Sequence, residues 1–264
     1  MHILAIIGAP TKEKGCTTRT VQALEQSLCD HRADTQVEYL FLEDLQLKGC
    51  QGHLTCIKLG EAQCPFSNDI SGLTQKMAAA DAVIFASPVH CFNVSALMKN
   101  MIDLLVYQMH RPEFFDKKAV VVATAAGAGQ KGVLKYLQKT VANWGFDVVG
   151  KLGTHSGLYD EDKYQVKLSE ATNRVAKKLI DEIERNRRKQ PGVAELINFR
   201  VWRSAVRQSK DASPFDWNHW QQSGWLDQDY YFPVKVNPLS NGVAFMVEKL
   251  IERTIRKVAV GPVT

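Results

Sequence analysis

The chain has 264 residues, with 33 lysine and arginine, 28 aspartate and glutamate, and six cysteine residues. With 45% apolar and 23% charged residues its composition is that of an ordinary globular protein, which excludes a disordered, collagen-like or disulfide-scaffold chain. There is no apolar run of about 18 residues that could span a membrane. The apolar start at residues 2–9 lacks the basic segment of a signal peptide, so a cytoplasmic location and no membrane contact are expected.

The positive charge is concentrated in one segment. Residues 174–210 carry 11 basic and 4 acidic side chains, a net charge of +7, whereas the whole chain carries +5. Such a run is typical of a solvated helix face, and a contact surface for an acidic partner or a second subunit is the alternative. No base-reading motif or aromatic RNA-binding platform accompanies the charge, so nucleic acid is not expected as a partner.

Short apolar runs alternate with helical patterns over the first 190 residues, which is typical of repeated βα units around a parallel sheet. Nearly continuous apolar, β-branched runs predict buried strands at residues 2–8, 37–42, 82–86, 119–124 and 147–152. Helical periodicity predicts helices at residues 18–30, 73–80, 96–107, 133–144 and 162–188. These elements predict an α/β fold with a doubly wound, five-stranded parallel sheet, whose ligands bind beyond the carboxyl ends of the strands.

The pattern changes after Gln190-Pro191-Gly192, so we expect one domain at residues 1–190 and a helical, Trp-rich C-terminal extension at 191–264. Helices are expected there at residues 193–206 and 241–258. Between them, residues 213–233 are rich in large aromatic side chains, which are costly to leave exposed. The extension is therefore expected to pack on the sheet domain, to form an oligomer interface, or to cover the active site.

The loop after the first strand, residues 8–18, is rich in Gly and Thr and opens directly into a helix. Its backbone N–H groups and hydroxyls, together with the helix dipole, suit an anion. It is neither a P-loop nor a dinucleotide-binding Gly-x-Gly-x-x-Gly motif.

The loop after the third strand combines Pro88, Phe92 and Asn93, with Ser95 placed to cap the following helix. A proline, an aromatic ring and an amide in one turn form a rigid shelf. Such a shelf suits a flat ring that is partly apolar and partly hydrogen-bonding.

These two loops resemble those of the NAD(P)H-dependent FMN reductase and iron–sulfur flavoprotein branch of the flavodoxin-like superfamily. Its members carry Gly-Ser-Pro-Arg…Gly-Asn-Thr after strand one and Ser-Pro-Val-Tyr…Val-Ser-x-x-Met-Lys-x-x-Ile-Asp after strand three. The second motif matches almost throughout from Ser87 to Asp103, whereas the first departs, with Ala9 in place of Ser and Cys16 in place of Asn. The resemblance covers roughly residues 1–185.

The resemblance implies a flavodoxin-like fold with FMN at the carboxyl edge of the sheet and NAD(P)H as electron donor. It implies no obligatory side-chain acid or base, because the flavin carries the chemistry. His90 stands where the family commonly has Tyr, and it is either a polar surface residue or a hydrogen-bonding partner of flavin or substrate. The residues that the resemblance assigns to FMN are Pro10, Thr11, Lys12, Cys16, Thr17, Thr18, Pro88, Val89, His90, Phe92, Asn93, Thr124, Ala126 and Gly127.

A cysteine-rich loop follows the second strand, where iron–sulfur flavoproteins carry Cys-x2-Cys-x2-Cys-x(4–7)-Cys. This chain has Cys50-x2-His53-x2-Cys56-x7-Cys64. Three interpretations stay open: a [4Fe-4S] cluster with one His ligand, a structural zinc on three thiolates and an imidazole, or a loop without metal. The metal-free loop is the leading interpretation.

The leading functional hypothesis is an FMN-dependent NAD(P)H oxidoreductase that reduces a small-molecule quinone, flavin, azo or nitroaromatic acceptor. The first alternative is an electron carrier that exchanges electrons with ferredoxin through a cluster at the cysteine loop. The second is a non-enzymatic flavodoxin-like binding protein. The family resemblance implies a homodimer or homotetramer.

Overall fold

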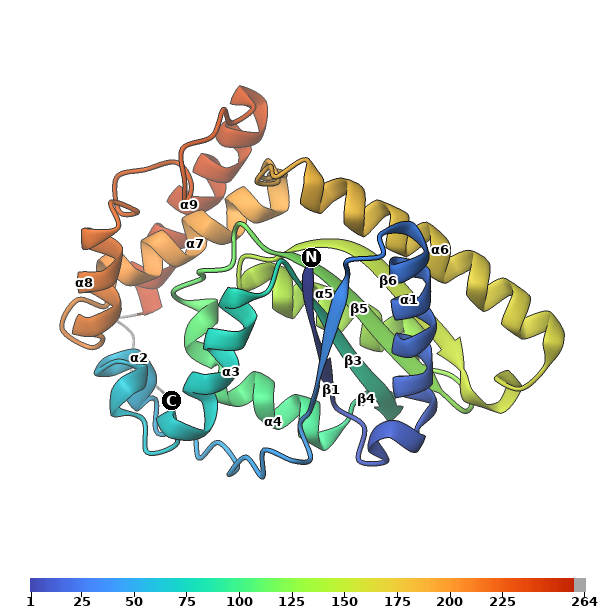
Figure 1. Cartoon of the computed structure of the whole chain (residues 1–264). Coiled ribbons are helices and arrows are strands. Elements are labelled where there is room, and N and C mark those ends of the chain that lie inside the picture. The colour runs from blue at the N-terminus through green and yellow to red at the C-terminus, as the bar shows by residue number, and fades with distance from the viewer. Residues whose placement is uncertain (259–264) are drawn as a thin grey trace. The chain divides into compact units, whose positions relative to one another are not determined.

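Five parallel strands form a sheet in the order β2-β1-β3-β5-β6 (Figure 1). The computed structural model describes the backbone of residues 1–258, together with all their side chains except those of residues 68, 69 and 254–258. A short antiparallel strand pairs with the end of β3. The bounds are β1 (His2–Ile7), β2 (Gln36–Phe41), β3 (Ala82–His90), β4 (Asn93–Val94), β5 (Lys118–Ala125) and β6 (Asp147–His155). The predicted five-stranded parallel sheet is confirmed.

Helices cover both faces of this sheet, as expected for a doubly wound fold (Figure 1). Alternate side chains along each strand face opposite ways, so Ile84 joins the core beneath α1 and α6. Its neighbour Phe85 points to the other face, where its ring centre lies 6.0 Å from that of Trp144 at the end of α5. The helices are α1 (Cys16–His31), α3 (Ser67–Ala79), α4 (Ala96–Leu104), α5 (Gln130–Asn143) and α6 (Asp162–Glu184).

The chain divides into two compact units that the linear sequence interleaves. The sheet unit comprises residues 1–52 and 65–188, and the described part of the C-terminal unit comprises residues 53–64 and 189–258. The helices of the C-terminal unit are α2 (Thr55–Lys58), α7 (Val193–Gln208), α8 (Pro214–Gln222) and α9 (Pro238–Val258). Residues 53–64, which contain most of the cysteine loop, therefore group with the extension rather than with the strands that flank them.

The cysteine loop is fitted closely to α8. A Cβ atom at Gly60 would lie 2.6 Å from the ring of Phe215, and Gly60 has a φ of +99°, which favours glycine. The close approach of backbone and ring explains why residues 53–64 belong to the C-terminal unit.

The aromatic side chains of the extension pack against one another. The ring of Phe199 on α7 lies 5.6 Å from that of Trp220 and 4.7 Å from that of Tyr231, and Tyr231 lies 4.8 Å from Trp225. These centroid separations are typical of favourable aromatic pairs. The aromatic residues thus supply the core of the C-terminal unit, an arrangement that composition alone did not reveal.

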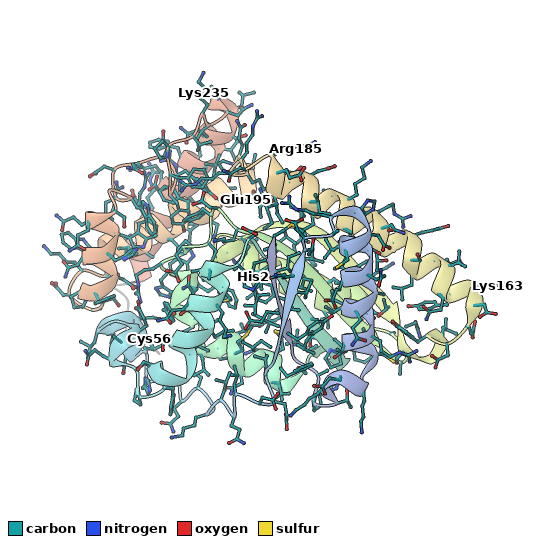
Figure 2. The ribbon with its side chains drawn as sticks, in the orientation of Figure 1. His2, Cys56, Lys163, Arg185, Glu195 and Lys235 are labelled. Atoms are coloured by element: carbon teal, nitrogen blue, oxygen red, sulfur yellow. The ribbon has the colours of Figure 1, made fainter. Side chains whose placement is uncertain are left out.

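The basic segment 174–210 is not one solvated face. Arg185 near the end of α6 projects outward (Figure 2), whereas Arg200 on α7 is only 4% exposed. Arg200 and Arg203 both donate hydrogen bonds to Glu248 of α9, at 3.0 Å and 2.7 Å for the closer nitrogens. Part of the positive charge therefore compensates a buried carboxylate. No helix in the described part of the chain is long and apolar enough to cross a membrane.

Candidate functional site

A cavity of about 510 Å³ lies where β1, β3 and β5 end. This volume is within the usual range for small-molecule sites, and its place at the carboxyl edge is where doubly wound sheets bind ligands. The residues lining it are Ala9, Pro10, Thr11, Lys14, Gly15, Cys16, Thr17, Pro88, Val89, His90, Thr124, Ala125, Ala126 and Ser156.

One end of the cavity is formed by the N-terminus of α1. The first helical hydrogen bond is donated by the Arg19 N–H to the Gly15 carbonyl over 3.1 Å, so the N–H groups of residues 16–18 precede the helical ladder. Gly15 caps this helix without a side chain, and a Cβ there would lie 2.2 Å from the hydroxyl oxygen of Thr11. Glycine therefore keeps the loop close around a cradle of N–H donors, which suits a phosphate.

Lys14 is the lysine that lines the cavity. Lys12, which the resemblance assigned to FMN, does not line the cavity and forms an ion pair with Asp44. The hydrogen bond to Asp44 and the charge of that carboxylate raise the pKa of Lys12 above its usual value. Among the described residues, the lysine in the cavity lining is thus Lys14, two residues further along the loop than Lys12.

Two threonines of α1 hold the cradle in place. The hydroxyl of Thr17 is hydrogen-bonded to that of Thr124 at the end of β5, over 2.6 Å. Thr18 donates to the Lys12 carbonyl over 2.6 Å, so its hydroxyl supports the loop from behind. Thr17 and Thr124 line the cavity, whereas Thr18 shapes it indirectly.

A serine network joins the loops after β1 and β3. Ser95 accepts a hydrogen bond from the Met98 N–H as the N-cap of α4 and donates to the Gly8 carbonyl over 2.6 Å. Its own N–H donates to the hydroxyl of Ser87 over 3.0 Å. The predicted capping role of Ser95 is confirmed, and the network fixes the two loops that form the cavity walls.

Strand β3 continues beyond the predicted residues 82–86 to His90 and forms a hairpin with β4, in which His90 pairs with Asn93. Val89 and His90 line the cavity, whereas Phe92 at the hairpin tip is 75% exposed. The Asn93 side chain accepts a hydrogen bond from the Val94 N–H over 2.8 Å. Phe92 and Asn93 thus lie beside the predicted ring site, at the turn.

The opposite wall comes from the loop after β5. Ala125 and Ala126 line the cavity, and a Cβ at Gly127 would enter open space. Ser156, which follows β6, completes the lining. Small side chains here allow the backbone to approach a bound ring closely.

Most of the residues that sequence analysis assigned to the cofactor meet in this one cavity, and the exceptions among them are Lys12, Thr18, Phe92, Asn93 and Gly127. Sequence analysis did not assign Lys14 or Gly15 individually, although both lie in the loop it singled out, and it missed Ser156. Ser156 could have been predicted from its position directly after the fifth parallel strand, because the carboxyl ends of all these strands lie at the same edge of the sheet. That these residues bind FMN stays a prediction.

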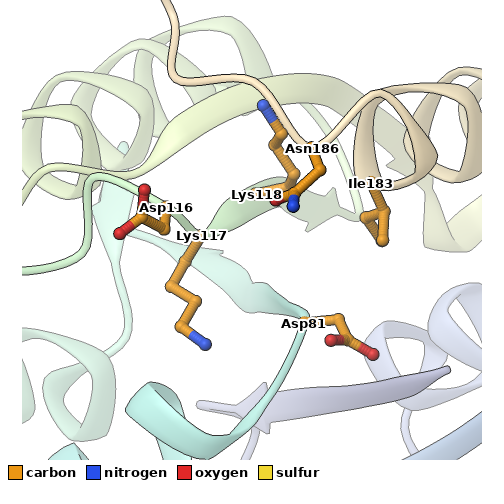
Figure 3. Close-up of a pocket in the computed structure, with 6 residues that line it drawn as sticks. All are labelled: Asp81, Asp116, Lys117, Lys118, Ile183 and Asn186. Carbon is orange, nitrogen blue, oxygen red and sulfur yellow. The ribbon is translucent and has the colours of Figure 1, made fainter.

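A second cavity, of about 350 Å³, lies at the amino edge of the sheet (Figure 3). Three of its charged side chains are paired with other residues of the protein: Asp81 accepts from the His2 N–H over 2.8 Å, and Lys118 pairs with Asp147 over 3.0 Å. Asp116 holds Arg188 through two hydrogen bonds. These pairs connect the starts of the strands, which makes the carboxyl edge the candidate for chemistry.

The four residues of the cysteine loop differ in their surroundings. Cys50 is exposed in the sheet unit, and its N–H donates to Asn100 over 3.2 Å. In the C-terminal unit the His53 Nδ1 accepts from the Thr55 N–H over 3.3 Å, Cys56 is 7% exposed and Cys64 is half-buried. Among the described residues, no three His, Cys, Asp or Glu side chains are arranged to hold a metal ion. The metal set Cys50, His53, Cys56 and Cys64 stays a prediction.

The geometry of the main cavity fits a phosphorylated flat ring. Its two ends differ in chemistry. One end offers backbone N–H donors and Lys14, and the other is lined by the apolar side chains of Pro88, Val89 and Ala126. FMN has the same polarity, a phosphate at one end and a planar ring at the other, so the residues present suit it.

Comparisons with known proteins agree with this reading. The model of the NADPH-dependent FMN reductase family matches residues 1–157. An iron–sulfur flavoprotein of Archaeoglobus fulgidus is 26% identical over 231 residues, which cover 86% of this chain and 100% of the relative. An FMN-dependent NADH:quinone oxidoreductase of Desulfotalea psychrophila is 26% identical over 174 residues, covering 58% of this chain and 82% of the relative.

Solved structures show the same fold at low sequence identity. An NAD(P)H:quinone oxidoreductase from Methanothermobacter marburgensis superposes with a TM-score of 0.52 at 18% identity, covering 68% of this chain and 96% of that one. An FMN-dependent NADH-azoreductase from Bacillus anthracis superposes with a TM-score of 0.53 at 14% sequence identity, covering 68% of this chain and 99% of that one. The match of the family model over more than half of the chain, on a flavodoxin-like fold, settles the assignment. The chain belongs to the NADPH-dependent FMN reductase family and is an NAD(P)H-dependent flavin oxidoreductase with FMN as its cofactor.

Proposed function

We propose that this enzyme uses NAD(P)H to reduce a small planar acceptor, namely a quinone, a free flavin, an azo compound or a nitroaromatic. The observation that carries the proposal is the cavity at the carboxyl edge, with a phosphate cradle at Gly15 and an apolar shelf at Pro88 and Val89. For a quinone, NAD(P)H and one proton from water are consumed, and NAD(P)⁺ and the hydroquinone are formed.

FMN, when bound, supplies the capacity to accept a hydride and to pass electrons on, so the protein has to bind and orient. The first turn of α1 and Lys14 would hold the phosphate. Pro88, Val89 and Ala126 would border the ring and exclude water from it. His90, which lines the same cavity, would donate a hydrogen bond to the ring or to the acceptor.

The test is anaerobic reduction of the FMN-loaded protein. NADH or NADPH should abolish the absorbance of oxidised flavin, and a quinone added afterwards should restore it. If the flavin stays oxidised with both nicotinamides, the proposal is wrong. The ratio of the two reduction rates gives the donor preference.

A second candidate function is electron transfer through a metal centre. The iron–sulfur flavoproteins among the relatives, together with the ligand-type spacing of Cys50, His53, Cys56 and Cys64, favour it. A cluster would let the chain exchange single electrons with ferredoxin, whereas zinc on the same residues would be structural. Iron, sulfide and zinc analysis of anaerobically purified protein, with Cys56→Ala as control, decides between them. Absence of all three removes this candidate and leaves the metal-free loop.

Self-association is the third proposal. Along α9 the apolar side chains of Leu239, Val243 and Met246 are exposed at helical spacing, as at helix–helix contacts. We expect a homodimer or homotetramer, and Met246→Glu should lower the native mass if this face takes part. We also expect the enzyme in the cytoplasm, where NAD(P)H is available.

A further inference from the structure

The tip of the β3–β4 hairpin has an unusual backbone. Cys91 and Phe92 occupy successive left-handed conformations, with φ of +48° and +63°. Two-residue hairpin turns with two positive φ angles strongly favour Asn-Gly, because a Cβ is unfavourable there. A cysteine followed by a phenylalanine therefore makes this turn strained, and strained turns that persist in a fold are found preferentially at binding sites.

The turn holds the aromatic ring of Phe92 in solvent beside the cavity. Phe92 is 75% exposed, although its neighbours Val89 and His90 line the cavity. The ring is supported on one side: a Cβ at Gly129 would lie 3.4 Å from Phe92 Cδ1 and 2.8 Å from Val89 Cγ1. Gly129, with a φ of +106°, thus makes room for Val89 and for one edge of the ring.

We propose that Phe92 is the acceptor-stacking residue of this enzyme: its supported, exposed ring binds a planar aromatic acceptor, a quinone, beside the cavity that Val89 and His90 line. Aromatic rings stack on one another at little conformational cost, and a ring already held by Gly129 and by a rigid turn loses little freedom on binding. This inference rests on the proposed function and deepens it, because it assigns one residue to the acceptor rather than to FMN.

The test compares four FMN-loaded proteins: wild type, Phe92→Ala, Phe92→Trp and Val166→Ala. Val166 on α6 is a matched control, because it is also an exposed apolar side chain of the sheet unit and does not line the cavity. The acceptors are menadione, a planar quinone, and ferricyanide, an octahedral ion with no ring to stack. The KM for each acceptor and kcat are measured at saturating NAD(P)H, the KM for NAD(P)H is measured at saturating acceptor, and the Kd for FMN is measured separately.

We expect Phe92→Ala to raise the KM for menadione by about tenfold, with kcat, the KM for ferricyanide and the Kd for FMN within twofold of wild type. Phe92→Trp should restore the KM for menadione, and Val166→Ala should change none of these values. The proposal is overturned if Phe92→Ala leaves the KM for menadione within twofold of wild type, raises both acceptor KM values alike, or raises the KM for NAD(P)H instead. Failure of the proposed function itself would differ, since wild-type flavin would then not be reduced by either nicotinamide.

A second readout needs no cofactor. Phe92→Gly removes the ring and also the Cβ at a positive φ, whereas Phe92→Ala keeps the Cβ. The apo-protein of Phe92→Gly should therefore melt at a higher temperature than that of Phe92→Ala, whereas the two FMN-loaded variants should show the same rise in the KM for menadione. If the glycine variant is no more stable, the turn is not strained and the proposal loses its basis.

Discussion

The hydroxyl of Thr17 in the first turn of α1 bonds that of Thr124 at the end of β5 over 2.6 Å, and both residues are buried. This single bond connects the phosphate cradle to the wall on which the ring would lie. We expect Thr17→Val to weaken FMN binding and to lower the free energy of unfolding by about 1–3 kcal/mol, because it leaves the Thr124 hydroxyl buried without this partner.

The matched double variant Thr17→Val/Thr124→Val removes both hydroxyls. Its loss of stability, measured by urea unfolding, should be smaller than the sum of the two single losses, since no polar group is then stranded. If the loss of stability in the double variant equals the sum of the two single losses, the hydrogen bond between the two hydroxyls contributes nothing to stability.

Lys14 and Lys12 make a natural pair of test and control. Lys14→Ala should weaken FMN binding by about tenfold and leave riboflavin binding unchanged, because only FMN carries the phosphate. Lys12→Ala should cost little affinity, because Lys12 pairs with Asp44 and does not line the cavity. Titration of flavin fluorescence measures both, and equal losses in the two variants would contradict the assignment of Lys14 to the phosphate.

The carboxylate of Glu248 makes the C-terminal unit sensitive to acid. Burial raises its pKa, but the hydrogen bonds from Arg203 and Arg200 outweigh burial and hold the pKa below the usual value. A carboxyl group whose pKa is lowered in the folded state stabilises the fold above its unfolded pKa, about 4.3, and this stability is lost as the pH falls through the folded value.

Glu248→Gln should therefore destabilise the C-terminal unit by about 3–5 kcal/mol at neutral pH, because buried Arg203 loses its counter-ion and Arg200 keeps only the exposed Asp229. The variant should also flatten the acid limb of the unfolding profile followed by circular dichroism. Glu184→Gln is the control, since its ion pair with Arg32 is exposed and screened by solvent and should contribute little to stability.

Gly60 tests the packing of the cysteine loop on α8. Gly60→Ala would place a Cβ 2.6 Å from the Phe215 ring at an unfavourable φ, so the loop should loosen and the thiol of Cys56 should react faster with a thiol reagent. Gly72→Ala is the matched control: its Cβ meets nothing within 4 Å, and alanine favours the helix α3. An unchanged thiol reactivity in Gly60→Ala would contradict the close packing.

The sheet was predictable from the sequence because buried parallel strands are apolar runs bounded by turns, and the helices between them carry a strong period. Helix α8 was missed because its apolar residues are Trp and Phe without a regular stripe, so its core is visible only once α7 lies beside it. The β3–β4 hairpin was missed because Cys91-Phe92 lacks the residues that mark such turns.

The candidate site was predictable to the level of its loops. The sequence could not predict which of the two lysines, Lys12 or Lys14, faces the cavity. That choice depends on Asp44, which is 32 positions from Lys12 and pairs with it only in the folded chain. In the same way Ser156 enters the cavity through strand order, which no local pattern contains.

The interleaving of the two units has a consequence for the history of this chain. Because the C-terminal unit is assembled from residues 53–64 and from the chain after residue 188, no single cut of the polypeptide separates it from the sheet unit. A fragment ending at residue 188 would keep the cysteine loop but lose Phe215, which lies against Gly60. An ancestor with only one of these two segments would have had half of a folded unit. We therefore expect related chains to carry both segments or neither.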